Sequence, residues 1–122
     1  GDGSFGWHTA VKGYFDEEFN AIEATNDGYV AVGSSCSSNR DLKAVGNRGG
    51  SDALVVTFSN GGSLKSIQSY GGSRDDSFGG VCVLSDGQII ACGSTYSDNG
   101  DLIGSKYLSN GSASMGMIAR FK

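Results

Sequence analysis

Short apolar and aromatic runs recur along the chain, and each is bounded by Gly, Asn, Asp or Ser. Runs of this length that are rich in β-branched and aromatic residues are typical of β-strands. Eight runs fit the description, four in each half of the chain: 5–11, 19–25, 29–34, 53–58, 64–70, 78–84, 88–95 and 115–121. No segment carries a capped apolar stripe at helical spacing, so the pattern predicts an all-β fold.

Two turn signals predict which strands are neighbours. Asn26-Asp27-Gly28 and Ser85-Asp86-Gly87 each separate two predicted strands. Such sequences favour the primed turns of tight β-hairpins, because these turns need positive φ angles that Gly, Asn and Asp tolerate. We therefore expect the second and third strands of each half to pair in antiparallel fashion through primed turns.

The two halves of the chain are copies of one another. At a shift of 59 residues, which short insertions increase to 60 and then 63, matching residues include Gly13 and Gly72, Asp16 and Asp75, Phe19 and Phe78, Asp27-Gly28 and Asp86-Gly87, Gly33-Ser34 and Gly93-Ser94, Asp41-Leu42 and Asp101-Leu102, and Phe58 and Phe121. The insertions fall in predicted turns and loops, as expected of copies that share one fold. The sequence thus predicts two repeats, 1–59 and 60–122. A chain of 122 residues is the size of one small domain, so the repeats would form a single structural unit.

Three segments carry a resemblance to a known family. They are Tyr-Gly-Gly-Ser-Arg-Asp-Asp-Ser-Phe at 70–78, Asp-Gly-Tyr-Val-Ala-Val-Gly at 27–33 and Gly-Gly-Ser-Asp-Ala-Leu-Val-Val at 49–56. With four short strands per repeat, they make the chain resemble the bacterial β-propeller repeat family, whose blades are kelch-like. The second repeat departs from the pattern, because Met115-Gly116 stands where the first has Asp52-Ala53.

The resemblance implies two tandem four-stranded antiparallel propeller-like blades in a secreted or cell-surface bacterial protein. The strands of the first blade, from inner to outer, would be 19–25, 29–34, 53–58 and 64–70. The chain would then begin with an unpaired outer strand, 5–11, and end on a blade that lacks one. We expect 5–11 to pair with 115–121, because this covers two exposed sheet edges. Two blades cannot close a ring, so the partner would be another copy in a homo-oligomer or neighbouring blades of a longer chain.

Charge and hydropathy narrow the range of partners. The net charge is −4, and the nine Lys and Arg residues are scattered. Counterion release needs a cluster of basic side chains, so we expect no nucleic-acid partner. No apolar run approaches the roughly 18 residues of a membrane span.

The cysteine count bears on the redox state. Three cysteines, Cys36, Cys82 and Cys92, are not the even set of a disulfide framework. A tight hairpin would leave Cys82 and Cys92 one position out of register, so we expect buried free thiols.

Paired acids recur at one position of both repeats, just before the aromatic residue that opens the inner strand. They are Asp16-Glu17 and Asp75-Asp76. Carboxylates there would bind sugar hydroxyls or a cation near a propeller's axial opening. The alternative is a turn in which the side chains cap backbone amides, and recurrence in both repeats favours that second interpretation.

One loop has the composition of a cation site. Residues 97–101, Ser-Asp-Asn-Gly-Asp, place the oxygen ligands Asp98, Asn99 and Asp101 at alternating spacing, which suits a hard cation such as calcium. The matching loop 37–41 carries Arg40 where a ligand or glycine would sit. A polar loop without metal is the alternative.

Copy-specific residues suggest a binding role. Tyr96 and Tyr107 lie in or beside long loops, where a flat aromatic face complements a pyranose ring. Arg74 is also specific to one repeat. No catalytic constellation is recognisable, and the single His8 cannot be placed beside a cysteine. We therefore expect a non-catalytic extracellular module that recognises a glycan or a protein through its loops, or else a structural repeat that serves as a scaffold or spacer.

Overall fold

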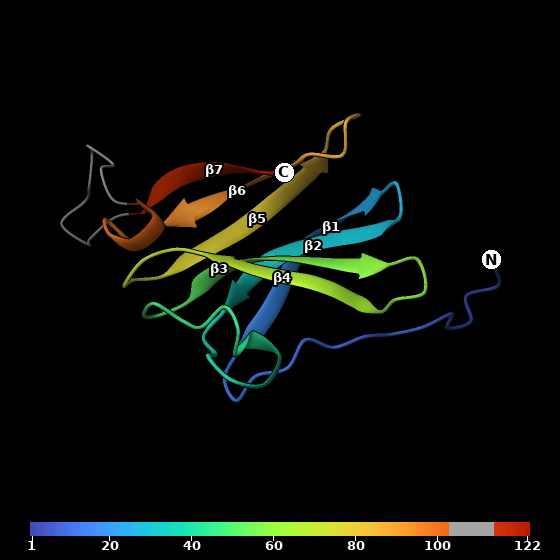
Figure 1. Cartoon of the computed structure of the whole chain (residues 1–122), viewed down its shortest axis with the longest axis horizontal. Helices are drawn as coiled ribbons and strands as arrows, with labels where there is room; N and C mark the ends of the chain where they lie inside the picture. The colour runs from blue at the N-terminus through green and yellow to red at the C-terminus, as the bar shows by residue number, and fades with distance from the viewer. Residues whose placement is uncertain (103–113) are drawn as a thin grey trace.

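The computed structural model describes residues 1–102 and 114–122, which form two antiparallel sheets (Figure 1). In spatial order, the first sheet contains β1 (Glu17–Thr25), β2 (Gly28–Ser35), β3 (Asp52–Ser59) and β4 (Leu64–Tyr70). The second contains β5 (Asp76–Val83), β6 (Ile89–Thr95) and β7 (Met115–Phe121). Single-turn 3-10 helices, η1 (Arg40–Leu42) and η2 (Gly100–Leu102), follow β2 and β6. The all-β prediction is confirmed, and no helix of the described residues is long and apolar enough to cross a membrane.

The hairpin between β1 and β2 has the predicted pairing but a different turn. Thr25 pairs with Gly28, so residues 26–27 form the whole loop, and neither has a positive φ angle. The expected primed turn is therefore wrong here, and it is also wrong in the second hairpin, where the Gly87 amide donates to the Leu84 carbonyl and neither residue between them has a positive φ. Gly28 is needed for another reason: a Cβ on it would lie 1.8 Å from the carbonyl oxygen of Phe58 on the adjacent strand. Glycine is required at 28 because the two backbones approach closely, whereas at 87 it is favoured by its positive φ angle of 87°.

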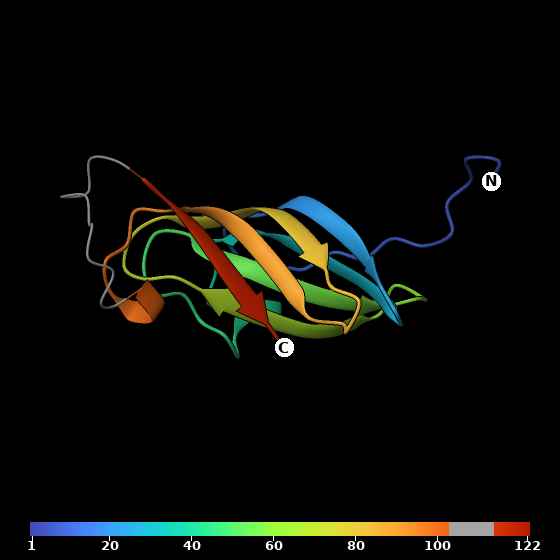
Figure 2. The same ribbon diagram turned by 90° about the horizontal axis from the view of Figure 1, so that it is seen from above.

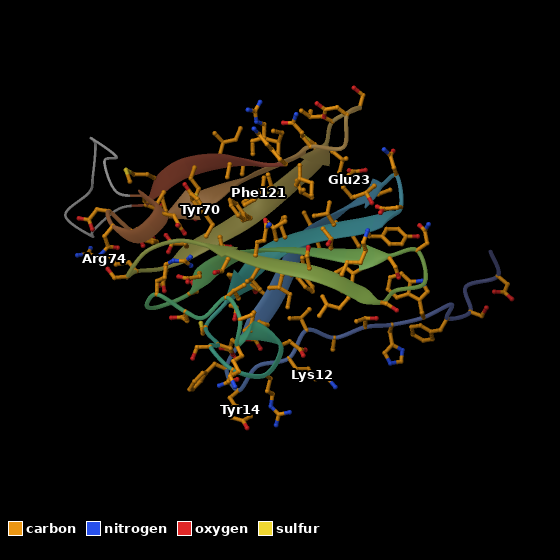
Figure 3. The ribbon with its side chains drawn as sticks, in the orientation of Figure 1. Lys12, Tyr14, Glu23, Tyr70, Arg74 and Phe121 are labelled. Atoms are coloured by element: carbon orange, nitrogen blue, oxygen red, sulfur yellow. The ribbon has the colours of Figure 1, made fainter. Side chains whose placement is uncertain are left out.

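The larger core lies between the two sheets, which stack face to face (Figure 2). Its buried residues come from one face of the first sheet and from the facing side of the second: Val30, Val32, Ala53, Val55, Phe78 and Ala91. The Tyr70 ring stacks on Phe78 at 6.2 Å and meets Phe121 edge-on at 6.5 Å. Figure 3 shows Tyr70 and Phe121 where the sheets meet. We call the whole contact between the two sheets the seam.

The opposite face of the first sheet has a smaller core of its own. Ala31, Leu54, Val56 and Phe58 are buried there together with Leu42 of η1. Val11, Val45 and Ile67 pack at its margin. The loop after β2 therefore covers part of this face.

The strand expected over residues 5–11 is wrong for the single chain. The segment is irregular and runs beside the first sheet, where the Thr9 hydroxyl donates to the Gly62 carbonyl and the Trp7 ring lies 5.7 Å from that of Tyr29. Its expected partner, β7, is the free edge of the second sheet, on the other side of the molecule (Figure 1). The two therefore do not meet within one chain.

The cysteines are free, but the expectation that they are buried is wrong. Cys36, Cys82 and Cys92 are all exposed. Cys82 pairs across the hairpin with Ile90 and Cys92 with Gly80, so the two thiols are two positions out of register rather than one. Cys82 and Cys92 lie on the second sheet, and Cys36 lies in the loop after β2.

Equivalent phenylalanines test the seam. Phe78 is fully buried in it, whereas Phe19, which opens β1 as Phe78 opens β5, is 43% exposed. We expect Phe78→Ala to lower the free energy of unfolding by about 3–5 kcal/mol, because it leaves a cavity in a packed core. Phe19→Ala should cost less than half as much. Urea denaturation measures both, and equal losses would contradict the assignment of Phe78 to the main core.

Candidate functional site

Four consecutive backbone amides before β1 are satisfied by side chains instead of by a strand. The amides of residues 12–15 donate to Asp41 Oδ2 at 2.8 Å, Glu17 Oε2 at 3.0 Å, Asn39 Oδ1 at 2.9 Å and Ser37 Oγ at 3.0 Å. We call this set the first clasp. It ties the segment that enters β1 to the loop that leaves β2.

A second clasp repeats the arrangement before β5. The amides of residues 71–74 donate to Asp101 Oδ2 at 3.0 Å, Asp76 Oδ2 at 3.0 Å, Asn99 Oδ1 at 2.8 Å and Ser97 Oγ at 3.1 Å. Asp76 is almost fully buried and also accepts hydrogen bonds from the hydroxyls of Thr95 and Ser97. One acid of each predicted pair, Glu17 or Asp76, is thus an internal acceptor.

The clasp also occupies two of the three residues expected at a calcium site. Asn99 accepts from the Ser73 amide, and Asp101 accepts from the Gly71 amide and lies 3.3 Å from Arg48 Nη2. Asp98 is exposed. Among the residues that the structure describes, no group of three or more His, Cys, Asp or Glu side chains is arranged to hold a metal ion.

Arg40 takes the backbone position that Gly100 takes in the second clasp. Its φ is 50° and that of Gly100 is 62°, both in the left-handed region. The Arg40 guanidinium lies 4.6 Å from the centre of the Tyr14 ring, and this cation–π contact offsets some of the backbone strain. The shared conformation accounts for the glycine at 100.

Four acidic residues line a hollow at the end of the seam next to the clasps. This acidic hollow has a volume of about 510 Å³ and is lined by Asp16, Glu17, Glu18, Ser34, Cys36, Ser51 and Asp75. Asp16, Glu18 and Asp75 are exposed. Asp75 Oδ1 also accepts from the Ser51 amide at 3.0 Å, which fixes its side chain at the junction of the two sheets. Carboxylates from both repeats therefore face one cavity that no basic residue lines.

The acidic hollow acts on the thiol at its wall. Desolvation raises the pKa of Cys36, and the negative charges of Asp16, Asp75 and Glu17 raise it further. A raised thiol pKa reduces the thiolate fraction near neutral pH and with it the reactivity of the thiol. Cys36 can therefore report on the charge of the hollow.

A buried carboxylate lies beneath the hollow. Asp52 Oδ2 accepts from the amide and the guanidinium of Arg48 at 3.0 and 3.1 Å, while Oδ1 has no partner among the described residues. Desolvation raises the pKa of Asp52, and the nearby charge of Asp76 adds to the effect, against the opposing influence of Arg48. The negative form of Asp52 is thus disfavoured in the folded chain.

The structure brings only some of the sequence candidates together. Asp16, Glu17 and Asp75 meet in the hollow, and Asp76 lies buried behind it. Tyr96 donates its amide to the Asp75 carbonyl at 2.9 Å and is 40% exposed.

Two sequence candidates remain to be placed, and four residues that line the hollow were not predicted. Arg74 is exposed at the second clasp (Figure 3), and Tyr107 lies outside the described residues. Sequence reasoning missed four lining residues of the hollow: Glu18, Ser34, Cys36 and Ser51. The match of Ser34 with Ser94 in the second repeat was the one signal that could have indicated Ser34.

Comparisons with protein-family models, with curated proteins and with solved structures found no match to this chain.

The charge of the hollow can be measured at Cys36. We expect Asp16→Asn to increase the rate of Cys36 alkylation by iodoacetamide severalfold at pH 7.5, because removing a negative charge lowers the pKa of the thiol. Mass spectrometry of the labelled peptides gives the rate, with Cys82 and Cys92 as internal references. Glu23→Gln is the control, because Glu23 lies toward the other end of β1 from Tyr14 (Figure 3). An unchanged Cys36 rate in Asp16→Asn would show that Asp16 does not act on the thiol.

The buried Asp52 predicts a pH dependence of stability. Its folded pKa lies above the ordinary value of 3.8, so the folded state binds the proton more tightly. The stability that this proton contributes is present at low pH and is lost as the pH rises through the raised pKa. We expect Asp52→Asn, relative to the unaltered chain, to gain stability as the pH is raised from about 4 to 7. Urea denaturation across this range tests it, and a difference that stays constant would contradict the assignment.

Proposed function

We propose that the chain is a non-catalytic binding module of a secreted or cell-surface protein and that it recognises a glycan through the acidic hollow. The observation that carries the proposal is the convergence of Asp16, Glu18 and Asp75, from both repeats, on one cavity. At about 510 Å³ the hollow lies within the size range of small-molecule sites.

The lining groups favour a hydroxyl-rich ligand. Carboxylates accept hydrogen bonds strongly, and sugar hydroxyls donate them. The hydroxyls of Ser34 and Ser51 can donate or accept. Tyr96 is exposed beside Asp75 and could supply a flat apolar face for a sugar ring. Because the lining holds no basic side chain, an anionic ligand would be repelled.

The proposal includes the arrangement of the sheets as adjacent blades of a propeller. β1 and β5 pack against each other across the seam, as the inner strands of neighbouring blades would. The hollow lies at the end where both strands begin.

The fold withdraws one of the four acids of the hollow from any catalytic use. Both carboxylate oxygens of Glu17 accept hydrogen bonds from the chain itself, from the Gly13 amide and the Ser35 hydroxyl. A glycosidase needs two carboxylates free to act as acid and base or nucleophile on opposite sides of the bond. Glu17 is committed to the clasp and is not available for that chemistry.

Glycan binding is tested by an array screen followed by calorimetry with the best sugar. We expect the double variant Asp16→Asn, Asp75→Asn to bind about tenfold or more weakly, because a charged hydrogen bond is worth roughly 1.5–3 kcal/mol. Asparagine keeps an acceptor oxygen for the Ser51 amide, so the fold should be retained. Glu23→Gln should bind as the unaltered chain does, and bound sugar should protect Cys36 from alkylation. A folded chain that binds no glycan on the array would refute the proposal.

A structural repeat without a ligand is the second candidate, and the duplicated clasp favours it. Features that recur in both repeats hold each repeat together, and Glu17 and Asp76 do so here. Asp16 and Glu18 distinguish the two candidates, because their simultaneous replacement by Asn and Gln should weaken glycan binding in a binding module, whereas a scaffold should bind no glycan with or without the replacements.

A further inference from the structure

The two sheets meet through different faces. The first sheet contributes one face to the seam, with the residues Val30, Val32, Ala53 and Val55, and Ala21 at the margin. We call this its forward face. The second sheet offers Phe78, Val81, Ile89, Ala91, Met117, Ala119 and Phe121, and we call this its rear face. The seam is therefore a head-to-tail contact between unlike surfaces.

Each sheet also has the face that the other uses in the seam. The repeat and the strand registers match Phe19, Ile22, Ala31 and Phe58 of the first sheet with Phe78, Val81, Ala91 and Phe121 of the second. They likewise match Val30, Val32 and Val55 with Ile90, Cys92 and Ile118. The first sheet thus has a rear face, and the second has a forward face, on the outside of the molecule.

Both outer faces are apolar and partly open, although Ala31 and Phe58 of the rear face are buried with Leu42 of η1. Ile118 is 75% exposed, whereas its counterpart Val55 is 3% exposed in the seam. Ile22 is 62% exposed, and Phe19 is open where Phe78 is buried. The exposed rear face borders an apolar cavity of about 320 Å³ lined in part by Phe19, Ile22 and Phe58. Singly exposed apolar residues are ordinary, but here they make two surfaces that are complementary within the same chain.

We propose that copies of this chain assemble head to tail, the forward face of the second sheet of one copy packing on the rear face of the first sheet of the next. The seam inside the chain supplies the template for the contact between chains. Heterologous contacts of this kind form closed rings when the rotation between copies closes and open filaments when it does not.

The clasps show how the N-terminal segment takes part. β4, which belongs to the first sheet, leads through the second clasp into β5 of the second sheet. Residues 5–11 lead in the same way through the first clasp into β1. Because the two clasps have matching hydrogen bonds, residues 5–11 are delivered to the sheet behind the first one, which in the assembly is the second sheet of another copy.

β7 is the edge that this segment would join. β4 pairs with β3 so that Ile67 faces Val56 and Tyr70 faces Ala53. The repeat places His8 and Val11 at the positions of Ile67 and Tyr70, and Ala119 and Gly116 at those of Val56 and Ala53. In the single chain, Phe5 is 91% and Trp7 43% exposed. Transfer of the segment to β7 of another copy would uncover more of the rear face, because Trp7 and Thr9 line its cavity, and would add a fourth strand to the second sheet.

The assembly completes a second hollow. In the acidic hollow, Asp75 of the second sheet faces Asp16 and Ser34 of the first. Between copies, Asp16 of the next copy would face the matching residues Asp75 and Ser94, with Tyr96 in the place of Cys36. Cavities with a thiol wall and with a tyrosine wall would therefore alternate around the assembly.

Size-exclusion chromatography with light scattering at micromolar concentration tests the faces. We expect an oligomer for the unaltered chain and monomers for Ile118→Glu and for Ile22→Glu, because each places a charge in one of the two faces. Both side chains are exposed in the single chain, so both variants should fold, and circular dichroism verifies this. Gln68→Glu, an exposed change on β4, is the matched control and should leave the mass unchanged.

Mixing the two monomeric variants separates head-to-tail contact from any symmetric one. Ile118→Glu keeps an intact rear face and Ile22→Glu an intact forward face, so we expect one heterodimer and nothing larger. A monomeric unaltered chain, an unchanged oligomer in either variant, or no heterodimer would overturn the proposal.

Cross-linking tests the strand. In a chain whose three cysteines are replaced by Ser, His8→Cys with Ala119→Cys should form an intermolecular disulfide on oxidation. Ala10→Cys with Ala119→Cys, two residues out of register, should not. Equal cross-linking of the two pairs would overturn the strand assignment.

Discussion

The structure depends on the satisfaction of four consecutive backbone amides just before the first strand of each sheet. These amides have no strand partner, and a hydrogen bond to a charged side chain contributes about 1.5–3 kcal/mol where it is shielded from water and less where it is exposed. In each clasp, side chains from the loop after the next strand and from the inner strand itself accept all four. The same bonds fix the path of the chain into the inner strand, so satisfying the donors also sets how one sheet lies on its neighbour.

This demand divides the acids between two tasks. Glu17 and Asp76 turn toward the backbone, and Asp16 and Asp75 remain at the surface of the hollow. Asp52 belongs to neither group. Only one of its carboxylate oxygens accepts a hydrogen bond from the described residues. Because burial and the charge of Asp76 disfavour its charged form, Asp52 lowers the stability of the fold as the pH rises.

The sequence predicted the strands and their order well, because short β-branched runs and turn residues act locally. It could not predict Gly28, whose role is to let the Phe58 carbonyl approach. Nor could it show that the cysteines are exposed, because Cys92 belongs to a face whose counterpart, Val32, is fully buried. Residues 5–11 have the sequence of a strand but lack an edge to join within the chain.

The candidate site was predictable only in part. Asp16 and Asp75 were found because they recur, while Cys36 and Ser51 are the two ends of the loop between β2 and β3 and enter the hollow only through the packing of that loop. Asn99 and Asp101 resembled cation ligands because side-chain oxygens that can bind a cation can equally accept hydrogen bonds from backbone amides. Only the positions of the amides of residues 71–73 distinguish the two interpretations.

The clasp also defines where one building block of this protein ends and another begins. A block that starts at the amide of Lys12 and ends at Tyr70 carries its own clasp, three strands and the fourth strand that closes them. Duplication of the corresponding stretch of gene would add a complete sheet and reuse the existing seam, with no new interface to be selected. A chain lengthened in this way would gain a whole sheet that packs through the same kind of seam.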